Sequence, residues 1–175
     1  MKIINNKFKG LFLFKNKSYK DNRGHFSELV RENVLNKKFT FQVMSFSKKN
    51  VVRGLHLQLK KSQGKFVSVL KGKIFDVAVD LRLNSKTFGK YYSCILSENN
   101  NTSIYIPPGF AHGFQALSKE NYIIYSCTEY RNKKSEISIS PLDKNLNINW
   151  PLSKKILSKK DHNAMSLNDF KNINK

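Results

Sequence analysis

Residues 65–81, KFVSVLKGKIFDVAVDL, contain two apolar, β-branched runs on either side of the sequence Lys71-Gly72-Lys73. Val, Ile and Phe favour the pleated, half-buried surface of a strand, and Gly is a common turn residue. The stretch therefore predicts two neighbouring strands that are joined by a tight turn.

The second run also shows which side chains share a face, because successive side chains of a strand point to opposite sides. One side is wholly apolar and consists of Phe75, Val77, Val79 and Leu81. The other side carries two carboxylates and consists of Ile74, Asp76, Ala78 and Asp80. A barrel with polar groups inside would give this pattern, and so would a sheet with one face in water.

Seven further runs of the same kind lie on both sides of this stretch, at 39–46, 51–58, 90–96, 102–106, 113–117, 121–130 and 136–140. Turn-forming sequences separate them, at 83–90, 97–102 and 107–109. Many short strands with regular turns predict an all-β sandwich or closed barrel. Helical signals are confined to 28–36 and 166–173, the second with Ser166 as its N-cap.

The length of 175 residues predicts a single domain over 1–175, with a frayed tail at 168–175. Cys94 and Cys127 lie in apolar runs and are expected to be buried free thiols, and their spacing resembles no zinc site. No apolar run reaches the roughly 20 residues of a membrane helix. The first fourteen residues lack a small-residue cleavage site, so we expect no signal peptide and a cytoplasmic protein.

The formal net charge of +20 raises the question of nucleic-acid binding. Of the 32 basic residues only five are Arg, and the lysines are scattered among Asn and Ser in turn-like stretches. This distribution indicates a compositional drift of the whole chain rather than a dedicated phosphate-binding patch. The resulting field would still attract small anionic molecules.

The stretch VVRGLHLQ, residues 51–58, places Arg53, Gly54 and His56 inside a predicted strand. Gly within a strand marks a bulge or a close approach of another backbone. Arg53 and Lys65 bring cations near His56, an arrangement that suits an anion beside a titratable base. From the local sequence alone, we expect Tyr125 to be a core residue and Asp161 to be an exposed loop carboxylate.

Ordered blocks along the chain resemble the dTDP-4-dehydrorhamnose 3,5-epimerases, cupin-fold enzymes of deoxysugar biosynthesis. The resemblance covers about residues 8 to 165, in blocks at 21–28, 50–58, 63–90, 104–118, 123–130, 146–152 and 156–161. It implies a cupin-type double-stranded β-helix, or jelly-roll barrel, with a few short peripheral helices.

The resemblance also implies a reaction. The substrate of the family is a nucleotide-linked 4-keto-6-deoxyhexose, whose ketone acidifies the hydrogens at C3 and C5. By resemblance, His56 is the base, Asp161 orients it, Tyr125 is the acid on the opposite face, and Lys65 stabilises the enolate. The substrate carries its own electron sink, so no cofactor is expected. The clustered His and Glu of metal-dependent cupins are absent from the sequence, so we also predict no metal.

The remaining expectations from the resemblance concern substrate binding and assembly. The matching positions are Arg53 and His112 for the diphosphate, Arg23, Glu28 and Gln42 for the nucleoside, Tyr19 against the base, and Tyr130 and Arg131 beside the substrate. A bulge at Gly54 would bring Arg53 and His56 to one wall of the barrel. Family members form homodimers by exchange of the N-terminal strand, so Tyr19 and Arg23 are expected to serve the neighbouring subunit.

Two departures from the family pattern leave alternatives open. Met44 stands where the family has a nucleotide-contacting Asn, and Arg131 replaces a second aromatic residue after Tyr130. A relative that inverts only C3 or C5, or that uses another nucleotide, is therefore the second hypothesis. A non-catalytic basic binding protein and a metal-dependent cupin are the hypotheses from other classes.

Overall fold

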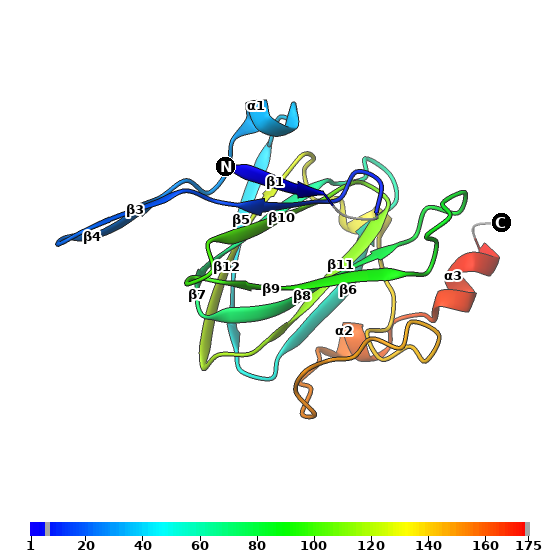
Figure 1. The fold of residues 1–175 in the computed structure, drawn as a ribbon. Helices are drawn as coiled ribbons and strands as arrows, with labels where there is room; N and C mark the ends of the chain where they lie inside the picture. Colours follow the sequence, from blue (N-terminus) through cyan, green and yellow to red (C-terminus); the bar gives the residue numbers. More distant parts are fainter. Residues whose placement is uncertain (6–7, 174–175) are drawn as a thin grey trace.

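The computed structural model describes residues 1–5 and 8–173 and contains two antiparallel sheets (Figure 1). The six-stranded sheet has the order β1 (Lys2–Asn5), β2 (Phe12–Lys15), β10 (Thr102–Ile106), β7 (Lys65–Lys71), β12 (Glu120–Cys127) and β5 (Phe41–Lys48). The five-stranded sheet has the order β13 (Glu136–Ser138), β6 (Val52–Gln58), β11 (Phe110–Ala116), β8 (Lys73–Asp80) and β9 (Tyr91–Ser97). The other elements are the hairpin β3 (Ser18–Asp21) and β4 (Gly24–Ser27), the helices α1 (Glu32–Leu35), α2 (Lys159–His162) and α3 (Leu167–Ile173), and the 3₁₀ turn η1 (Lys133–Ser135).

The main hydrophobic core lies between the two sheets. Val67 and Ile123 enter it from the six-stranded sheet, and Ile74, Ala78 and Phe114 enter it from the five-stranded sheet. All five side chains are buried. The sequence prediction of an all-β jelly-roll barrel is therefore confirmed.

The burial of strand β8 distinguishes between a barrel with polar groups inside and a sheet with one face in water, the two alternatives that its carboxylates left open. Asp76 and Asp80 are both fully buried, and the opposite face of β8 is buried as well. On that face Val77 packs in a second core with Trp150 and Phe170 of the C-terminal segment. The strand therefore belongs to a barrel that holds polar groups inside, because neither of its faces is in water.

The C-terminal helix confirms the helical signal at 166–173 and differs from the frayed tail predicted at 168–175. Helix α3 continues to Ile173, and its Phe170 is buried against the ring of Phe88, with ring centroids 6.5 Å apart. Ser166 caps the helix as expected, since its Oγ accepts a hydrogen bond from the backbone N–H of Asp169. Residues 174 and 175 of the predicted tail lie outside the described residues.

The N-terminal region contains strands that the sequence pattern did not resolve. Strands β1 and β2 extend the six-stranded sheet, and the β3–β4 hairpin projects from the barrel (Figure 1). On this hairpin the side chains of Tyr19 and Phe26 are 57% and 71% exposed. Only α1 was predicted in this part of the chain, and it is shorter than the predicted 28–36.

All nine predicted strands are present; β7 and β10 have the predicted ends, and the ends of the other strands are shifted. Strand β11 begins at Phe110, before the predicted start at residue 113, so His112 lies within the strand. Strand β12 ends at Cys127, so Tyr130 follows the strand. Cys94 is only half-buried, whereas Cys127 is buried, and both thiols are free.

Strand β6 contains the predicted irregularity at Gly54. Its pairing with β11 places His112 opposite His56 but Phe114 opposite Arg53, so β6 has one extra residue between the two pairs. Gly54 has a φ of +118° and packs against the backbone of Gly113. The bulge lets Arg53 and His56 line the same cavity although they are three residues apart, as predicted.

We expect Gly54→Ala to lower the free energy of unfolding by about 3 kcal/mol, because the new methyl group would combine a backbone clash with an unfavourable φ. A Cβ at this position would lie 2.5 Å from the Cα of Gly113. Urea denaturation measures the effect. Gly24→Ala is the matched control, since Gly24 also has a positive φ but its Cβ would meet nothing within 4 Å. An equal, small loss in both variants would contradict the role given to the contact.

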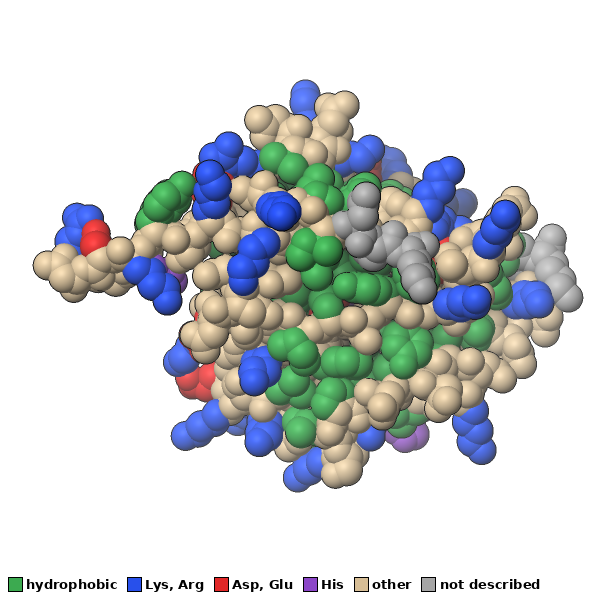
Figure 2. Space-filling view, in the orientation of Figure 1, with side chains coloured by type: hydrophobic (Ala, Val, Ile, Leu, Met, Phe, Trp, Pro, Cys, Tyr) green, Lys and Arg blue, Asp and Glu red, His purple; other side chains and the backbone are tan. Residues whose placement is uncertain are grey.

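The charged side chains are spread over the surface. In the face shown by Figure 2, Lys and Arg side chains are scattered between polar and apolar areas and do not form one continuous patch. Among the described residues, no helix has the length and apolar character needed to cross a membrane.

Candidate active site

A cavity of about 450 Å³ lies between the two sheets. Strands β5, β7 and β12 line it from the six-stranded sheet, and β6 and β11 line it from the five-stranded sheet. Strand β13 and helix α2 contribute to its wall. Seven of the predicted site residues line this one cavity, namely Arg53, His56, Lys65, His112, Tyr125, Arg131 and Asp161.

His56 and Asp161 form the central polar pair of the cavity. Nε2 of His56 lies 2.6 Å from Oδ1 of Asp161, and the His56 side chain is 30% exposed. Asp161 is buried in α2, which corrects its interpretation as an exposed loop carboxylate. The two residues are 105 positions apart, so the packing of α2 against β6 brings them together.

The environment of Asp161 determines which nitrogen of His56 carries the proton. Burial acts to raise the pKa of the Asp161 carboxyl, but hydrogen bonds from His56, Ser158 and the Gly54 backbone outweigh it and leave the pKa below its usual range. An ionised carboxylate only accepts hydrogen bonds, so Nε2 of His56 is the donor. In a neutral imidazole this leaves Nδ1 with a free lone pair that can accept a proton.

Lys65 reaches toward His56 from the opposite sheet. Its Nζ lies 3.4 Å from the backbone oxygen of His56. Burial is the main influence and holds the pKa of the Lys65 ammonium below its usual range, while nearby Cys127, Glu136 and Asp76 oppose the shift. A partly desolvated ammonium in this position can stabilise an oxyanion strongly, because little water competes for it.

Tyr125 faces the cavity from β12, on the wall opposite His56. Its hydroxyl is 3.1 Å from Oγ of Ser45 on β5. Burial raises the pKa of the Tyr125 phenol well above its usual range, against the weaker opposing effect of Ser45. The phenol therefore remains protonated at neutral pH and is available as a proton donor.

The other two predicted groups, Arg53 and His112, lie on β6 and β11 of the five-stranded sheet. Nε2 of His112 lies 2.7 Å from Oδ2 of Asp76, and both side chains are buried. Arg53 is held at the cavity by Ser47 Oγ, 2.9 Å from its Nε, and by the backbone oxygen of Phe46. An Arg and a His on one wall suit an anionic ligand.

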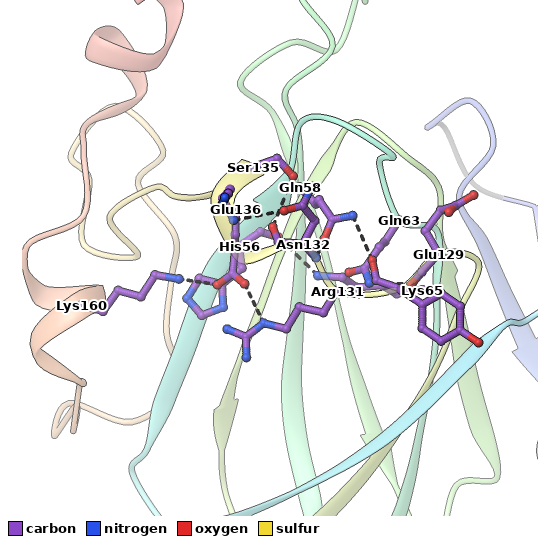
Figure 3. Close-up of polar contacts among 12 residues, drawn as sticks. His56, Gln58, Gln63, Lys65, Glu129, Arg131, Asn132, Ser135, Glu136 and Lys160 are labelled. Carbon is purple, nitrogen blue, oxygen red and sulfur yellow. Dashed lines mark hydrogen bonds and ion pairs between the residues drawn. The ribbon is translucent and has the colours of Figure 1, made fainter.

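Helix α2, strand β13 and the segment after β12 meet at a second carboxylate of the cavity. Figure 3 shows Glu136 between Lys160 and Arg131, with dashed lines to both. Arg131 Nε is 2.9 Å from Oε2 of Glu136, and Nζ of Lys160 pairs with Oε1.

Five predicted binding residues do not line the cavity of their own chain. Tyr19 and Arg23 lie on the projecting hairpin, and Glu28 pairs with Arg31. Gln42 alternates with cavity-lining Phe41 and Val43, so its side chain lies on the outer face of the sheet. Tyr130 is 65% exposed and packs on Phe41, with ring centroids 5.8 Å apart.

Sequence reasoning missed several members of the site. Ser45, Cys127, Ser158, Glu136 and Lys160 line the cavity without having been predicted to do so. Asp76 had a signal, since it is a carboxylate in an apolar strand, but its partner His112 could not be deduced. Within residues 1–5 and 8–173, no group of three His, Cys, Asp or Glu residues could hold a metal ion.

Comparison with known proteins places this cavity in a family. The family profile described as dTDP-4-dehydrorhamnose 3,5-epimerase matches residues 5–169. The chain is 40% identical to the dTDP-4-dehydrorhamnose 3,5-epimerase of Methanothermobacter thermautotrophicus over 96% of its own length and 95% of that protein.

Two solved structures are similar in fold and sequence. The first is the Legionella pneumophila dTDP-6-deoxy-D-glucose-3,5-epimerase in complex with dTDP-4-keto-L-rhamnose, with a TM-score of 0.92, 45% identity, and coverage of 95% of this chain and 93% of that one. The second is a Mycobacterium tuberculosis epimerase, with a TM-score of 0.95, 32% identity, and coverage of 99% and 92%. The match to the family profile includes every element that lines the cavity. The chain belongs to the dTDP-4-dehydrorhamnose 3,5-epimerase family.

Proposed function

We propose that this protein epimerises C3 and C5 of a dTDP-linked 4-keto-6-deoxyhexose and forms dTDP-4-dehydro-L-rhamnose. The observation that carries the proposal is the arrangement of one cavity. The His56–Asp161 pair and Tyr125 lie on opposite walls, and Lys65 reaches toward His56 from the sheet of Tyr125. Inversion of a carbon needs a base on one face and an acid on the other, which this arrangement supplies.

The proposed reaction uses groups of this chain, the substrate and solvent protons. Nδ1 of His56 removes the proton next to the ketone, and the electrons of the broken C–H bond form an enolate at C4. Lys65 stabilises the enolate oxygen, and the Tyr125 hydroxyl returns a proton to the other face of the carbon. Solvent then takes the proton from His56 and restores that of Tyr125. Asp161 acts as a positioning residue, since it fixes the tautomer of His56.

The same proposal assigns the diphosphate to Arg53 and His112. Their wall adjoins His56 through the β6 bulge and the β6–β11 pairing, so an anion held there would leave the hexose next to the base. Arg suits phosphate because its guanidinium donates in a planar fork.

Proton NMR in heavy water, with dTDP-4-keto-6-deoxyglucose as substrate, tests the function. We expect deuterium to enter at both C3 and C5. Incorporation at one carbon would replace the proposal by a single-centre epimerase, for which the presence of Arg131 in the cavity is the motivating observation. No incorporation at either carbon would contradict the proposed substrate.

The hairpin and the outer face of the six-stranded sheet support a homodimer as part of this proposal. Exposed apolar side chains gather there, including Ile3, Met44, Phe46 and Leu70. Gln42 lies on the same face, and Tyr19, Arg23 and Glu28 lie on or beside the hairpin. We infer that these four polar or aromatic groups complete the nucleoside site of a neighbouring subunit in the cytoplasm.

Mixing two inactive variants tests this assembly. His56→Asn removes the proposed base and Arg23→Ala removes a proposed nucleoside contact. If the sites are shared between subunits, mixed dimers contain one intact site and regain activity, and sedimentation reports a dimer mass. A monomer mass, or no recovery after subunit exchange, would contradict the shared site.

A further inference from the structure

Glu136 is a single carboxylate that pairs with two cations in the wall of the cavity. Arg131 and Lys160 each bind one of its oxygens, and its side chain is 11% exposed. Burial acts to raise the pKa of Glu136, but the hydrogen bonds from Arg131 and Lys160 lower it to about 2. Glu136 is therefore ionised near neutral pH and supplies the negative charge with which both cations pair.

The Lys160 side of this pairing leads to the His56–Asp161 pair. Lys160 precedes Asp161 in α2, a helix of only four residues, so fixing one side chain restricts its neighbour. Glu136 belongs to β13, which pairs with β6 and places Ser138 opposite His56. The Lys160–Glu136 ion pair thus ties the helix of Asp161 to the strand beside His56. The flanking Lys159 and His162 are exposed and make no ion pair in the described part of the chain.

The Arg131 side of the pairing leads into the cavity itself. Arg131 uses Nε to bind Glu136, and its Nη1 and Nη2 make no hydrogen bond with any described residue. The side chain lines the cavity and is 53% exposed. A guanidinium that is fixed at one edge presents its remaining N–H groups in a defined direction, which suits oxygen acceptors of a bound sugar.

We propose that Glu136 is a positioning residue that fixes two functional groups at once. Through Lys160 it holds Asp161 and thereby the imidazole of His56, and through Arg131 it orients two N–H groups toward oxygens of the hexose. Arg131 is then a specificity-determining residue of this chain. The inference about Arg131 rests on the proposed function, whereas the link from Glu136 to His56 is measurable without a substrate.

The first test is therefore made on the substrate-free protein. The Nε2–H of His56, 2.6 Å from a carboxylate, is expected to give a slowly exchanging downfield proton resonance in NMR spectra. Glu136→Gln and Lys160→Gln should broaden or remove it by faster exchange with water, whereas Lys159→Gln, on the same helix, should leave it intact. A resonance that is equally sharp in all four proteins would overturn the positioning role.

Kinetics on the full chain make the second test. Glu136→Gln should lower kcat by roughly tenfold, because a small displacement of the base is costly, while the affinity for dTDP alone stays the same. In the pH profile of kcat/KM for Glu136→Gln, the decrease on the alkaline side should also occur at lower pH than in wild type. The reason is the pKa of Lys65, which the negative charge of Glu136 raises and the positive charge of Arg131 lowers. Without the Glu136 charge, Lys65 faces Cys127, Asp76 and an unpaired Arg131, so its pKa falls and the neutral amine is favoured. Glu120→Gln, which breaks the exposed Lys71–Glu120 pair, should change none of these values.

The two arms of Glu136 are separated by single substitutions. Lys160→Gln should reproduce the loss of kcat, and Arg131→Gln should raise KM for the sugar nucleotide about tenfold with no change in the affinity for dTDP. If Glu136→Gln fails to fold, Lys160→Gln and Arg131→Gln still test the positioning role and the specificity role separately. Identical behaviour of Arg131→Gln and wild type would overturn the specificity role. If wild type itself exchanges no C3 or C5 proton, the proposed function fails, and the substrate-free resonance still judges the positioning role.

Discussion

Replacing His56 with Asn is expected to slow deuterium incorporation at both C3 and C5 by about 10³- to 10⁴-fold, the upper part of the range for loss of a general base. Asn is a neutral polar side chain that is smaller than His, and its amide cannot accept a proton at neutral pH. The rate is measured by proton NMR in heavy water with the 4-keto sugar nucleotide.

The control for this variant is His162→Asn. His162 also lies in α2, but it is exposed and does not line the cavity, so the exchange rates should equal those of wild type. The affinity of His56→Asn for dTDP should also be unchanged, because His56 is not assigned to the nucleotide. Persistent exchange at one carbon would show that another base serves that position and would remove His56 from half of the mechanism.

Replacing Tyr125 with Phe is expected to separate proton removal from inversion. His56 can still form the enolate, so deuterium should enter the substrate, but the acid on the opposite wall is gone. Formation of the inverted product should fall by about 10²- to 10³-fold. The measurement compares the rate of deuterium entry with the rate of product formation in the same NMR series.

Tyr122→Phe provides the matched control on the same strand. Tyr122 packs against Phe46 on the outside of the sheet, with ring centroids 5.0 Å apart, and does not line the cavity. It should therefore epimerise at the wild-type rate. Equal inhibition of exchange and inversion in Tyr125→Phe would contradict its role as acid, since it would mean that the hydroxyl acts before the enolate forms.

The barrel strands could be predicted because their residues carry the signal locally. Runs such as 65–71 and 73–80 have β-branched and apolar side chains that alternate with a period of two, and Gly72 lies between them. The strands before residue 28 are four residues long, and β1, β3 and β4 contain only one or two apolar side chains each. Their pairing depends on the neighbouring strand or on the hairpin turn, so no comparable pattern identifies them.

The site was predictable only in part, because many of its contacts join residues that are far apart in the sequence. The glycine in VVRGLHLQ indicated the bulge, because a glycine weakens a strand interior and is usually found there where the ladder is irregular or another backbone comes close. The role of Asp161 came from resemblance alone, since its burial depends on how α2 docks on β6. Likewise the Glu136–Lys160 pair joins residues 24 positions apart, and no local pattern of charges marks it.

The contact between Gly54 and Gly113 has a consequence for how the sequence can vary. A Cβ on Gly113 would lie 2.5 Å from the backbone oxygen of Arg53, so neither glycine tolerates a side chain while the other strand stays in place. Neither residue carries a functional group, yet between them they set the spacing of Arg53, His56 and His112. In a saturation library selected for epimerisation, these two positions should be as depleted of substitutions as His56 itself. A map of mutational tolerance would thus mark Gly54 and Gly113 as essential, although their contribution is the lack of a Cβ atom, which lets the two strands come close together.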